Sequence, residues 1–469
     1  MTRRRPAFSR SRPNGRDLAV QVVYLVDQEA AYAGAAWSQA VSQLTMEPRE
    51  RRFGMEIAFG SIRRMRTIDW MIQKASGRPI EGIDPIARAV LRTAVYQISF
   101  MGGVPVHAAV SEGVESGRRL GHSGIAAFVN AVLRKVSSQD FDPGYPALEN
   151  DPIAHLAITL SYPDWIVAEW VERFGTDLAR SMLEAGNDQP AVVLRANTLR
   201  TSSDQLMSEL ASSGIGCRRG KYVPEAVELD SGIDSVESLP GYVQGNFAVQ
   251  DESSMLASYA MGLTTLMANG AHPALVIDAC AAPGGKSAHM AALGGDRVQI
   301  AAFDVSVARS ARIRNTVQRL GLGNISVDEL DARKLPERYE GLAKAVLVDA
   351  PCTGLGVLSR RPDARWRRTV QQREDLALLQ REILSACARC VCAGGTLVYT
   401  TCTVGPEENE SQIEWFLGTH PDFALDHLAP CMPTDSARAL AGEGGLVQML
   451  PGVHGVDGFF IARMRRRQG

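Results

Sequence analysis

The stretch ALVIDACAAPGGKS, residues 274–287, decides the fold of the second half of the chain. Its apolar run at 275–277 is typical of a strand buried on both faces, and Pro283, Gly284 and Gly285 end that run before a helical pattern begins. A strand, a tight loop and a helix in this order place the loop at the carboxyl edge of a parallel sheet. Glycines let backbone N–H groups approach a ligand there, and the helix N-terminus favours negative charge. The stretch therefore predicts a cofactor site.

Beyond residue 251, apolar runs and helical patterns alternate regularly. We expect a strand at each apolar run and a helix between successive runs. This alternation predicts an α/β fold, a doubly wound, Rossmann-like domain over residues 251–469. The expected strands lie near residues 274–280, 299–304, 325–330, 344–350, 395–401 and 458–464.

A nucleoside triphosphate is one candidate ligand, because Gly285, Lys286 and Ser287 resemble the end of a phosphate-binding P-loop. The apolar run that ends at Asp349 also resembles the magnesium-binding strand of such ATPases. Against this interpretation, a P-loop needs a glycine where Cys280 stands. A P-loop ATPase therefore stays as the alternative enzyme.

A carboxylate at the end of the next apolar run favours an adenosine cofactor instead. Asp304 follows residues 300–303, at roughly the distance from the loop at which an acidic residue binds ribose hydroxyls in this class of sheet. A diol-bearing adenosine fits Asp304 together with Asp349. These two carboxylates therefore join the loop in the predicted cofactor site.

The first part of the chain has a different pattern, with helical periodicities and almost no strand signal. It predicts an all-helical domain over residues 17–140, preceded by a flexible basic arm at 1–16. Prolines and glycine among the polar residues 141–152 are typical of a linker. Mixed helix and strand patterns then predict a small α+β subdomain over residues 153–250.

Composition excludes several function classes. The chain has 469 residues, a formal net charge of -2 and 45% hydrophobic residues, which is ordinary for globular protein. No apolar run approaches the roughly 18 residues that span a bilayer, and no secretory signal is recognisable, so we expect a cytoplasmic protein without membrane contact. The eight cysteines then predict reduced thiols. Because they form no zinc-ribbon spacing, we expect no metal.

Two of these cysteines follow strands of the predicted sheet, Cys352 shortly after Asp349 and Cys402 after the next strand. If the strands are neighbours, about 4.8 Å separates their backbones and both thiols can face one substrate. Thiolate addition at carbon 6 of cytosine would let carbon 5 take a methyl group from a sulfonium, and the second thiol would help to remove the carbon-5 proton. Asp349 can bond to the cytosine edge. Two buried structural cysteines are the alternative.

A cluster of arginines around one tryptophan follows the Cys352 loop. Guanidinium groups bind phosphates, and an indole ring is a platform on which an unpaired base stacks. We therefore expect RNA contact here and not a solvated charged face. The predicted RNA-binding residues are Arg360, Arg361, Arg365, Trp366 and Arg367.

Several motifs together resemble one enzyme family. They are similar to the RNA 5-methylcytosine methyltransferases of the bacterial RsmB (Sun, Fmu) type, over essentially residues 190–465. The helical region, with FVNAVLRKV at 128–136, resembles the NusB-type RNA-binding domain that this subfamily carries at its N-terminus. The motifs are DACAAPGGKS (278–287), VDAPCTGLG (348–356), RRPDARW (360–366), YTTCTVGPEENE (399–410) and DGFFIARM (457–464).

The resemblance implies S-adenosylmethionine as the cofactor, Cys402 as the nucleophile and Cys352 as the helper in proton removal or product release. The residues alone leave the order of the two thiols open. The NusB-like end implies 16S ribosomal RNA as the partner, methylated at cytosine 967. The implied cofactor site consists of Cys280, Ala281, Ala282, Pro283, Gly284, Gly285, Lys286, Asp304, Asp331 and Asp349.

Two alternatives remain beside this enzyme: the P-loop ATPase, and a non-catalytic NusB-like RNA-binding factor with a vestigial catalytic fold. Retention of both Cys352 and Cys402 argues against the second. The sequence leaves open the exact nucleotide, the choice between naked RNA and an assembly intermediate, and the oligomeric state, for which a monomer is expected.

Overall fold

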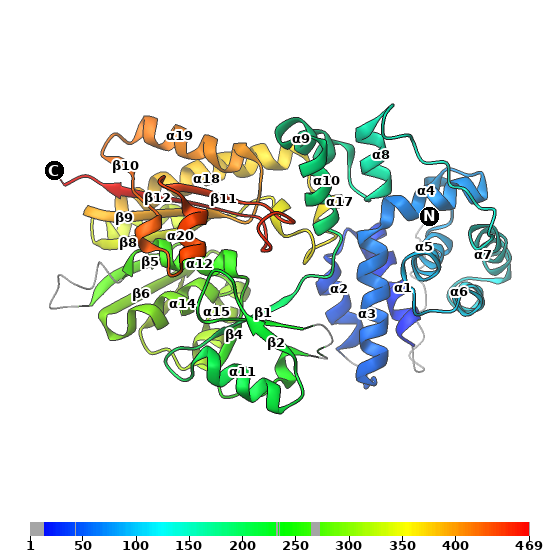
Figure 1. Ribbon diagram of the computed structural model, residues 1–469, viewed down its shortest axis with the longest axis horizontal. Coiled ribbons are helices and arrows are strands. Elements are labelled where there is room, and N and C mark those ends of the chain that lie inside the picture. The colour runs from blue at the N-terminus through cyan, green and yellow to red at the C-terminus, as the bar shows by residue number, and fades with distance from the viewer. Residues whose placement is uncertain (1–13, 43, 231–232, 234, 264–272, 469) are drawn as a thin grey trace. The chain divides into compact units, whose positions relative to one another are not determined.

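A computed structural model describes residues 14–42, 44–230, 233, 235–263 and 273–468. Its contacts divide the chain into two compact units, residues 1–189 with 358–367, and residues 190–357 with 368–469 (Figure 1). The chain therefore passes from one unit to the other after residues 189, 357 and 367. Of the predicted basic arm, residues 1–13 lie outside the described residues, and Asn14 already caps the first helix.

The first unit is helical, as the periodicities predict. Asn14 and Asp84 start two of its helices by accepting backbone N–H bonds with their side chains, and Pro85 occupies the first turn after Asp84. Gly77, in the left-handed region at φ 66°, ends another. The helices are α1 (Gly15–Glu29), α2 (Ala33–Val41), α3 (Pro48–Arg63), α4 (Met65–Ser76), α5 (Pro85–Phe100), α6 (Val106–Leu120), α7 (Ser123–Val136), α8 (Pro152–Thr159), α9 (Asp164–Phe174), α10 (Thr176–Ala185) and the short α17 (Ala364–Arg367).

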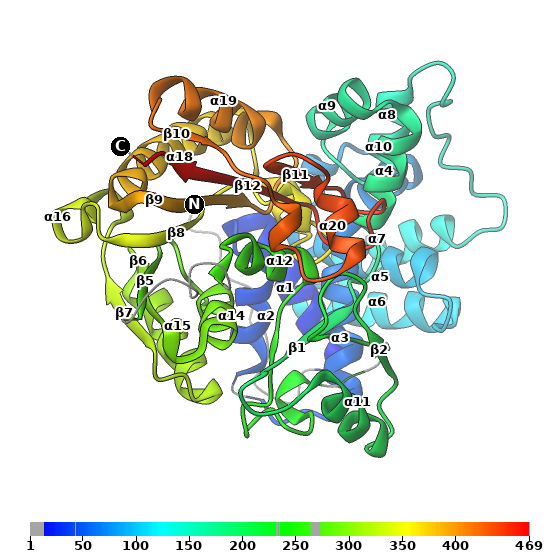
Figure 2. The same cartoon turned by 60° about the vertical axis from the view of Figure 1, so that its left-hand side comes forward.

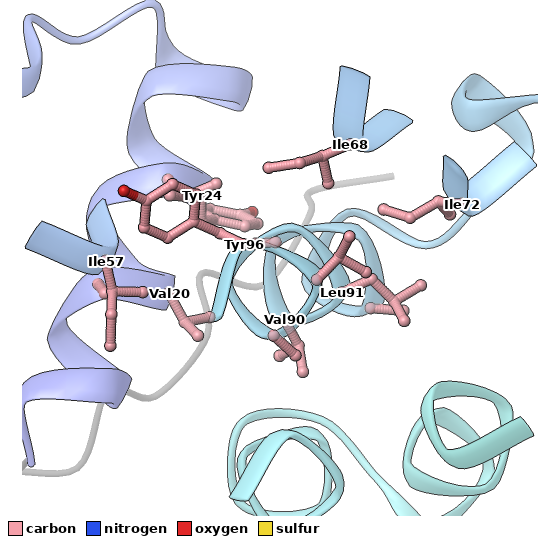
Figure 3. Close-up of a cluster of buried hydrophobic side chains, with 14 of the residues drawn as sticks. Val20, Tyr24, Ile57, Ile68, Ile72, Val90, Leu91 and Tyr96 are labelled. Carbon is pink, nitrogen blue, oxygen red and sulfur yellow. The ribbon is translucent and has the colours of Figure 1, made fainter. Parts of the chain in front are cut away.

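The core of this unit forms around α5, whose apolar side chains meet those of α1, α3 and α4 (Figure 3). Because apolar residues recur at helical spacing on each of these helices, one stripe of each is removed from water. The labelled members of the cluster are Val20, Tyr24, Ile57, Ile68, Ile72, Val90, Leu91 and Tyr96.

The second unit begins with a small antiparallel sheet in the order β2-β3-β1-β4. A capping box at Ser202 and Gln205 starts its helix, α11. The contacts group residues 153–189 with the helical unit, whereas their sequence pattern predicts them as part of this α+β subdomain. The elements are β1 (Val192–Ala196), α11 (Ser203–Ser212), β2 (Cys217–Arg219), β3 (Ala226–Leu229) and β4 (Phe247–Val249).

A larger sheet follows, in the order β10-β12-β9-β8-β5-β6-β7, with β11 beside β12. The pairs from β7 to β9 are parallel, and β12 runs antiparallel to β9. The doubly wound α/β architecture is therefore confirmed, and each of the six expected strands is present. The strands are β5 (Ala274–Asp278), β6 (Val298–Asp304), β7 (Ile325–Glu329), β8 (Ala343–Asp349), β9 (Val391–Thr401), β10 (Phe423–Leu425), β11 (Leu446–Met449) and β12 (Phe459–Arg466).

Helices cover both faces of this sheet (Figure 2). Val276 packs with residues of α12 and α14 on one face, whereas its neighbour Ile277 packs with α18 and α19 on the other. Burial on both faces explains why the strands appear in the sequence as continuous apolar runs. The helices are α12 (Glu252–Ala260), α14 (Gly285–Gly294), α15 (Val307–Leu320), α16 (Pro336–Tyr339), α18 (Val370–Cys390), α19 (Glu410–Thr419) and α20 (Asp435–Ala441).

Candidate active site

Two thiols meet at the carboxyl ends of β8 and β9. These strands are parallel neighbours, with Asp349 opposite Thr400 in the register. The loops that follow them bring the Sγ atoms of Cys352 and Cys402 to 3.4 Å from one another. The structure thus brings together the two cysteines that the sequence singled out.

The environment of Cys352 keeps its thiol protonated. The hydrogen bond with Cys402 raises the pKa of Cys352 well above its usual range, and burial and the nearby Glu408 carboxylate raise that pKa further. Two thiols this close cannot both ionise at low cost, because the second thiolate would face the charge of the first. Loss of a first proton from the pair therefore makes loss of the second more costly.

The glycine-rich loop between β5 and α14 is fixed by its own backbone. The N–H of Ala281 donates to the carbonyl of Phe303, and the N–H of Gly284 donates to that of Ala281, both at 2.7 Å. Gly284 has φ 99°, and a Cβ there would lie 3.1 Å from Ile313, so both conformation and space favour glycine. The loop leads directly into α14, as its pattern predicts.

Asp349 connects this loop to the strand of Cys402. Its Oδ2 accepts from the Nζ of Lys286 at 2.6 Å, and its Oδ1 accepts from the hydroxyl of Thr400 at 2.9 Å. The lysine that resembled a P-loop lysine is thus paired with the carboxylate of β8. This pairing fixes both side chains at the carboxyl edge of the sheet.

The other predicted cofactor carboxylates lie at the ends of neighbouring strands. Asp304 ends β6, is buried, and accepts from the N–H of Ser306 at 2.9 Å and from Arg309 at 3.0 Å. Asp331 follows β7 and is paired with Arg333 at 2.7 Å, and hydrogen bonds from this arginine lower the pKa of Asp331. Asp304 stands close enough to the loop to influence Cys280, whereas Asp331 is engaged by its own arginine.

A set of acidic groups surrounds the loop. Burial raises the pKa of Cys280, and the carboxylates of Asp278, Asp349 and Asp304 raise it further. Asp278 is fully buried, and burial raises its pKa to about 7. Its Oδ2 accepts from the hydroxyl of Ser287 at 2.6 Å, whereas its Oδ1 has no hydrogen-bond partner among the residues that the structure describes. Lys286 and Arg309, which pair with Asp349 and Asp304, offset part of this negative charge.

Comparisons with known proteins agree with this geometry. The family described as 16S rRNA methyltransferase RsmB/F matches residues 265–465. A probable ribosomal RNA small subunit methyltransferase B from Bacillus subtilis is 33% identical to this chain over 453 residues, which are 96% of this chain and 98% of the relative. This chain belongs to the RsmB/F family of rRNA methyltransferases. The ribosomal RNA small subunit methyltransferase B of Vibrio cholerae is 32% identical and covers 91% of the chain and 92% of its own length.

The same RsmB-type organisation extends over the rest of the chain. The NusB family matches residues 13–138, and a ferredoxin-like domain described for RsmF/B-like methyltransferases matches residues 162–235. A solved structure of a protein named PH0851 is 27% identical, has a TM-score of 0.78 and covers 97% of this chain and 99% of its own. An RNA methyltransferase with a NusB-like domain is thus supported over the P-loop ATPase and over the non-catalytic factor.

The arginine cluster of this RsmB-type chain differs from the sequence-based prediction. Arg365 is 0% exposed, and its guanidinium donates to the carbonyls of Arg63, Ser161 and Gly186 and to the side chain of Asn187, at 2.8 to 3.3 Å. No phosphate reaches it in this conformation. The expected RNA contact therefore does not hold for Arg365, because backbone acceptors, which leave no signal in the sequence, surround its guanidinium.

The neighbouring residues divide between packing and exposure. The indole N–H of Trp366 donates to the carbonyl of Ile62 at 2.8 Å, and Arg367 donates to the carbonyl of Ala30 at 2.6 Å. Arg361, by contrast, is exposed, and Arg360 is half-buried. Residues 358–367 are thus an anchored segment of the helical unit, with Arg361 on its surface.

Sequence reasoning gave no role to several polar residues beside the thiols. Thr353 and Thr403, which follow the two cysteines directly, are fully buried, as is Glu408. Glu408 belongs to the PEENE run of the YTTCTVGPEENE motif. An acidic residue so close to an expected active site is a signal for a buried carboxylate, but the sequence does not tell what it bonds to.

Within the described ranges, no group of three or more His, Cys, Asp or Glu side chains is arranged to hold a metal ion. No helix in the same ranges is long and apolar enough to cross a membrane.

Proposed function

We propose that this RsmB-type methyltransferase transfers a methyl group from S-adenosylmethionine to carbon 5 of a cytosine in 16S ribosomal RNA, through a covalent adduct with Cys402. The observation that carries the proposal is the 3.4 Å separation of two thiols at adjacent strand ends. A single structural cysteine needs no such partner. Two thiols that can flank one planar ring supply both the attack and the later elimination that this chemistry requires.

In this proposal the Sγ of Cys402 attacks carbon 6 of the cytosine, and carbon 5 becomes nucleophilic like an enamine carbon. Asp349 bonds to the cytosine edge and stabilises the charge that develops on attack. After methyl transfer, a base removes the proton from carbon 5. The bond between Cys402 and carbon 6 then breaks and releases methylated RNA.

The raised pKa of Cys352 suits a thiol that stays protonated during the attack. In the proposed order, which the family resemblance implies, Cys402 loses its proton and attacks while Cys352 keeps its own. Once Cys402 is bound to carbon 6, its sulfur is a neutral thioether, and the largest cause of the raised pKa of Cys352 is removed. Cys352 then ionises more easily and serves the elimination step.

The residues at the loop fit the proposed cofactor. Asp304 and Asp349 place carboxylate oxygens beside the loop, where they can accept hydrogen bonds from the ribose hydroxyls and the ammonium group of S-adenosylmethionine. We assign cofactor binding to residues 280–286 with Asp304 and Asp349. Asp331 joins this site if the cofactor replaces Arg333 as its hydrogen-bond partner. S-adenosylmethionine, when bound, supplies the electrophilic methyl group.

The RNA partner follows from the family and from the NusB-like domain. We propose that the helical unit docks 16S ribosomal RNA, with cytosine 967 as the target, and that the exposed Arg361 contacts its backbone. The base must leave its stack to meet the thiols, as for other enzymes that act on a nucleobase.

Bisulfite sequencing of 16S ribosomal RNA tests the proposal directly. A strain that lacks this gene should lose one protected cytosine, and the wild-type gene should restore it. A gene carrying Cys402→Ala should not restore it, although the protein accumulates to the same level. Protection that persists in the deletion strain, or that returns with Cys402→Ala, would contradict the proposal.

A further inference from the structure

A hydroxyl pair connects the residues that follow the two cysteines. The Oγ1 atoms of Thr353 and Thr403 lie 2.8 Å apart, and both side chains are fully buried. Each threonine is the direct neighbour of a cysteine in the chain. The bond between the hydroxyls therefore joins the two loops one residue after each thiol.

Glu408 orients this pair. One of its carboxylate oxygens accepts from the backbone N–H of Thr353 at 2.8 Å and from the side chain of Gln380 at 3.0 Å, and the other accepts from the hydroxyl of Thr353. A hydroxyl carries one proton. Because Thr353 gives its proton to Glu408, it accepts from Thr403, and the direction of the bridge is set.

Further bonds hold both loops to this bridge. Asn409 accepts from the hydroxyl of Thr401 at 2.5 Å and donates to the carbonyl of Thr403 at 3.2 Å, so it fixes both sides of Cys402. Arg368 donates to the carbonyl of Thr353 at 2.8 Å. The bridge is thus the central link of a buried network that ties both cysteine loops to Glu408 and Asn409.

We propose that the hydrogen bond from Thr403 to Thr353, oriented by Glu408, sets the spacing of the two thiols, so that these three side chains are positioning residues for the methyl transfer. The inference rests on the proposed function, in which both thiols act on one base. Reactions between held groups are sensitive to displacements of about 1 Å, which can change rates by about 100-fold. A bridge one residue from each thiol is placed to prevent such displacements.

A matched pair of variants separates the hydroxyl from the bulk of the side chain. Thr403→Val keeps the shape and removes the hydroxyl, whereas Thr403→Ser keeps the hydroxyl and removes a methyl group. Full-length protein without RNA or cofactor is treated with diamide, whose N=N bond takes up the two thiol hydrogens and is reduced to a hydrazine as the Cys352–Cys402 disulfide forms. Peptide mass spectrometry then measures the rate at which this disulfide forms and distinguishes it from disulfides of the other cysteines.

We expect Thr403→Val to form this disulfide about tenfold to 100-fold more slowly than the wild type and Thr403→Ser to form it at close to the wild-type rate. Methylation should follow the same order through kcat, with the KM for RNA and for S-adenosylmethionine unchanged. A wild-type disulfide rate in Thr403→Val overturns the inference. So does Thr403→Ser as slow as Thr403→Val, since the hydroxyl would then not be the cause.

Thr353→Val keeps the test decisive if Thr403→Val does not fold, because it breaks the same bond from the other loop, and a wild-type disulfide rate in Thr353→Val then overturns the inference. Where both single variants fold, the double variant adds a further check. Because either single change breaks the same bond, the double variant should be no slower than Thr353→Val alone, and additive losses would contradict a shared bond. The disulfide rate needs no methyl transfer. If the rates follow the prediction but no cytosine is methylated by the wild type, the spacing role stands and the proposed function fails.

Discussion

Asp278 is the residue at which burial and charge conflict most directly. It ends β5 directly before the glycine-rich loop, and its pKa of about 7 in the folded protein lies above the value of 3.8 expected when it is exposed. The folded state therefore binds this proton more tightly than the unfolded state does. Between pH of about 4 and 7 the contribution of Asp278 to stability falls as pH rises, and above that range it stays low.

Asp278→Asn should remove this dependence while it retains an acceptor for Ser287. We expect the variant to gain stability relative to the wild type between pH 5 and pH 8, by at most about 3 kcal/mol, since each pKa unit corresponds to about 1.4 kcal/mol. Thermal unfolding at the two pH values measures the difference. Burial lowers the pKa of His289 to about 4. Because His289 titrates in both proteins, its contribution to stability cancels in the comparison. If the difference in stability between Asp278→Asn and the wild type is the same at pH 5 and pH 8, this account of Asp278 is wrong.

At the scale of elements, the segment 358–367 contains one arginine that stabilises the fold and one that is free to contact RNA. Arg365 is buried and bonded to four acceptors, whereas Arg361 is exposed four residues earlier. Arg365→Ala leaves these acceptors without a donor and should destabilise the helical unit by about 2–4 kcal/mol. Arg361→Ala should leave the melting temperature unchanged and lower the slope of log K for RNA against log salt by about 0.7 to 0.9.

Calorimetry and RNA titrations at several salt concentrations test this pair of variants together. The two changes are matched, because each removes one guanidinium from the same segment. Equal melting temperatures for Arg365→Ala and the wild type would mean that burial of this side chain does not stabilise the unit. An unchanged slope of log K against log salt for Arg361→Ala would mean that Arg361 does not contact the RNA.

The elements also show which features could be predicted from sequence. The strands β5, β6, β8 and β9 are buried on both faces and are visible as apolar runs, and the thiols follow from their adjacency. Strands β10 and β11, of three and four residues, carry no such run and were not predicted. Arg365 was assigned to RNA because charge around a tryptophan is typical of that role. Three of its four acceptors are backbone carbonyls, which any residue supplies, and the fourth is the side chain of Asn187.

At the scale of the whole molecule, one segment from the second half of the chain, residues 358–367, belongs to the helical unit. Residues 358–367 begin six positions after Cys352, and the acceptors of Arg365 all lie within residues 63–187. A fragment of residues 190–469 lacks all of them. The segment should then lose its fixed conformation in the fragment while the sheet keeps its own core.

Limited trypsin digestion tests this expectation. In the full chain the bond after Arg365 should be protected, and in the fragment it should be cut early. Arg463, buried in β12 of the second unit, is the matched control, because protection there shows that the fragment is folded. Equal protection at Arg365 in both proteins would show that the segment needs no helical unit.

The central claim is that Cys402 attacks the base and Cys352 completes the cycle. The most direct measurement is a denaturing gel of each alanine variant, incubated with substrate RNA and S-adenosylmethionine and followed by peptide mapping. Cys352→Ala should still attack and transfer the methyl group and then stall, so a denaturant-stable protein–RNA band attached through Cys402 is predicted. Cys402→Ala should give no band. A band from Cys402→Ala that maps to Cys352 would reverse the assignment, and no band from either variant would contradict the covalent route.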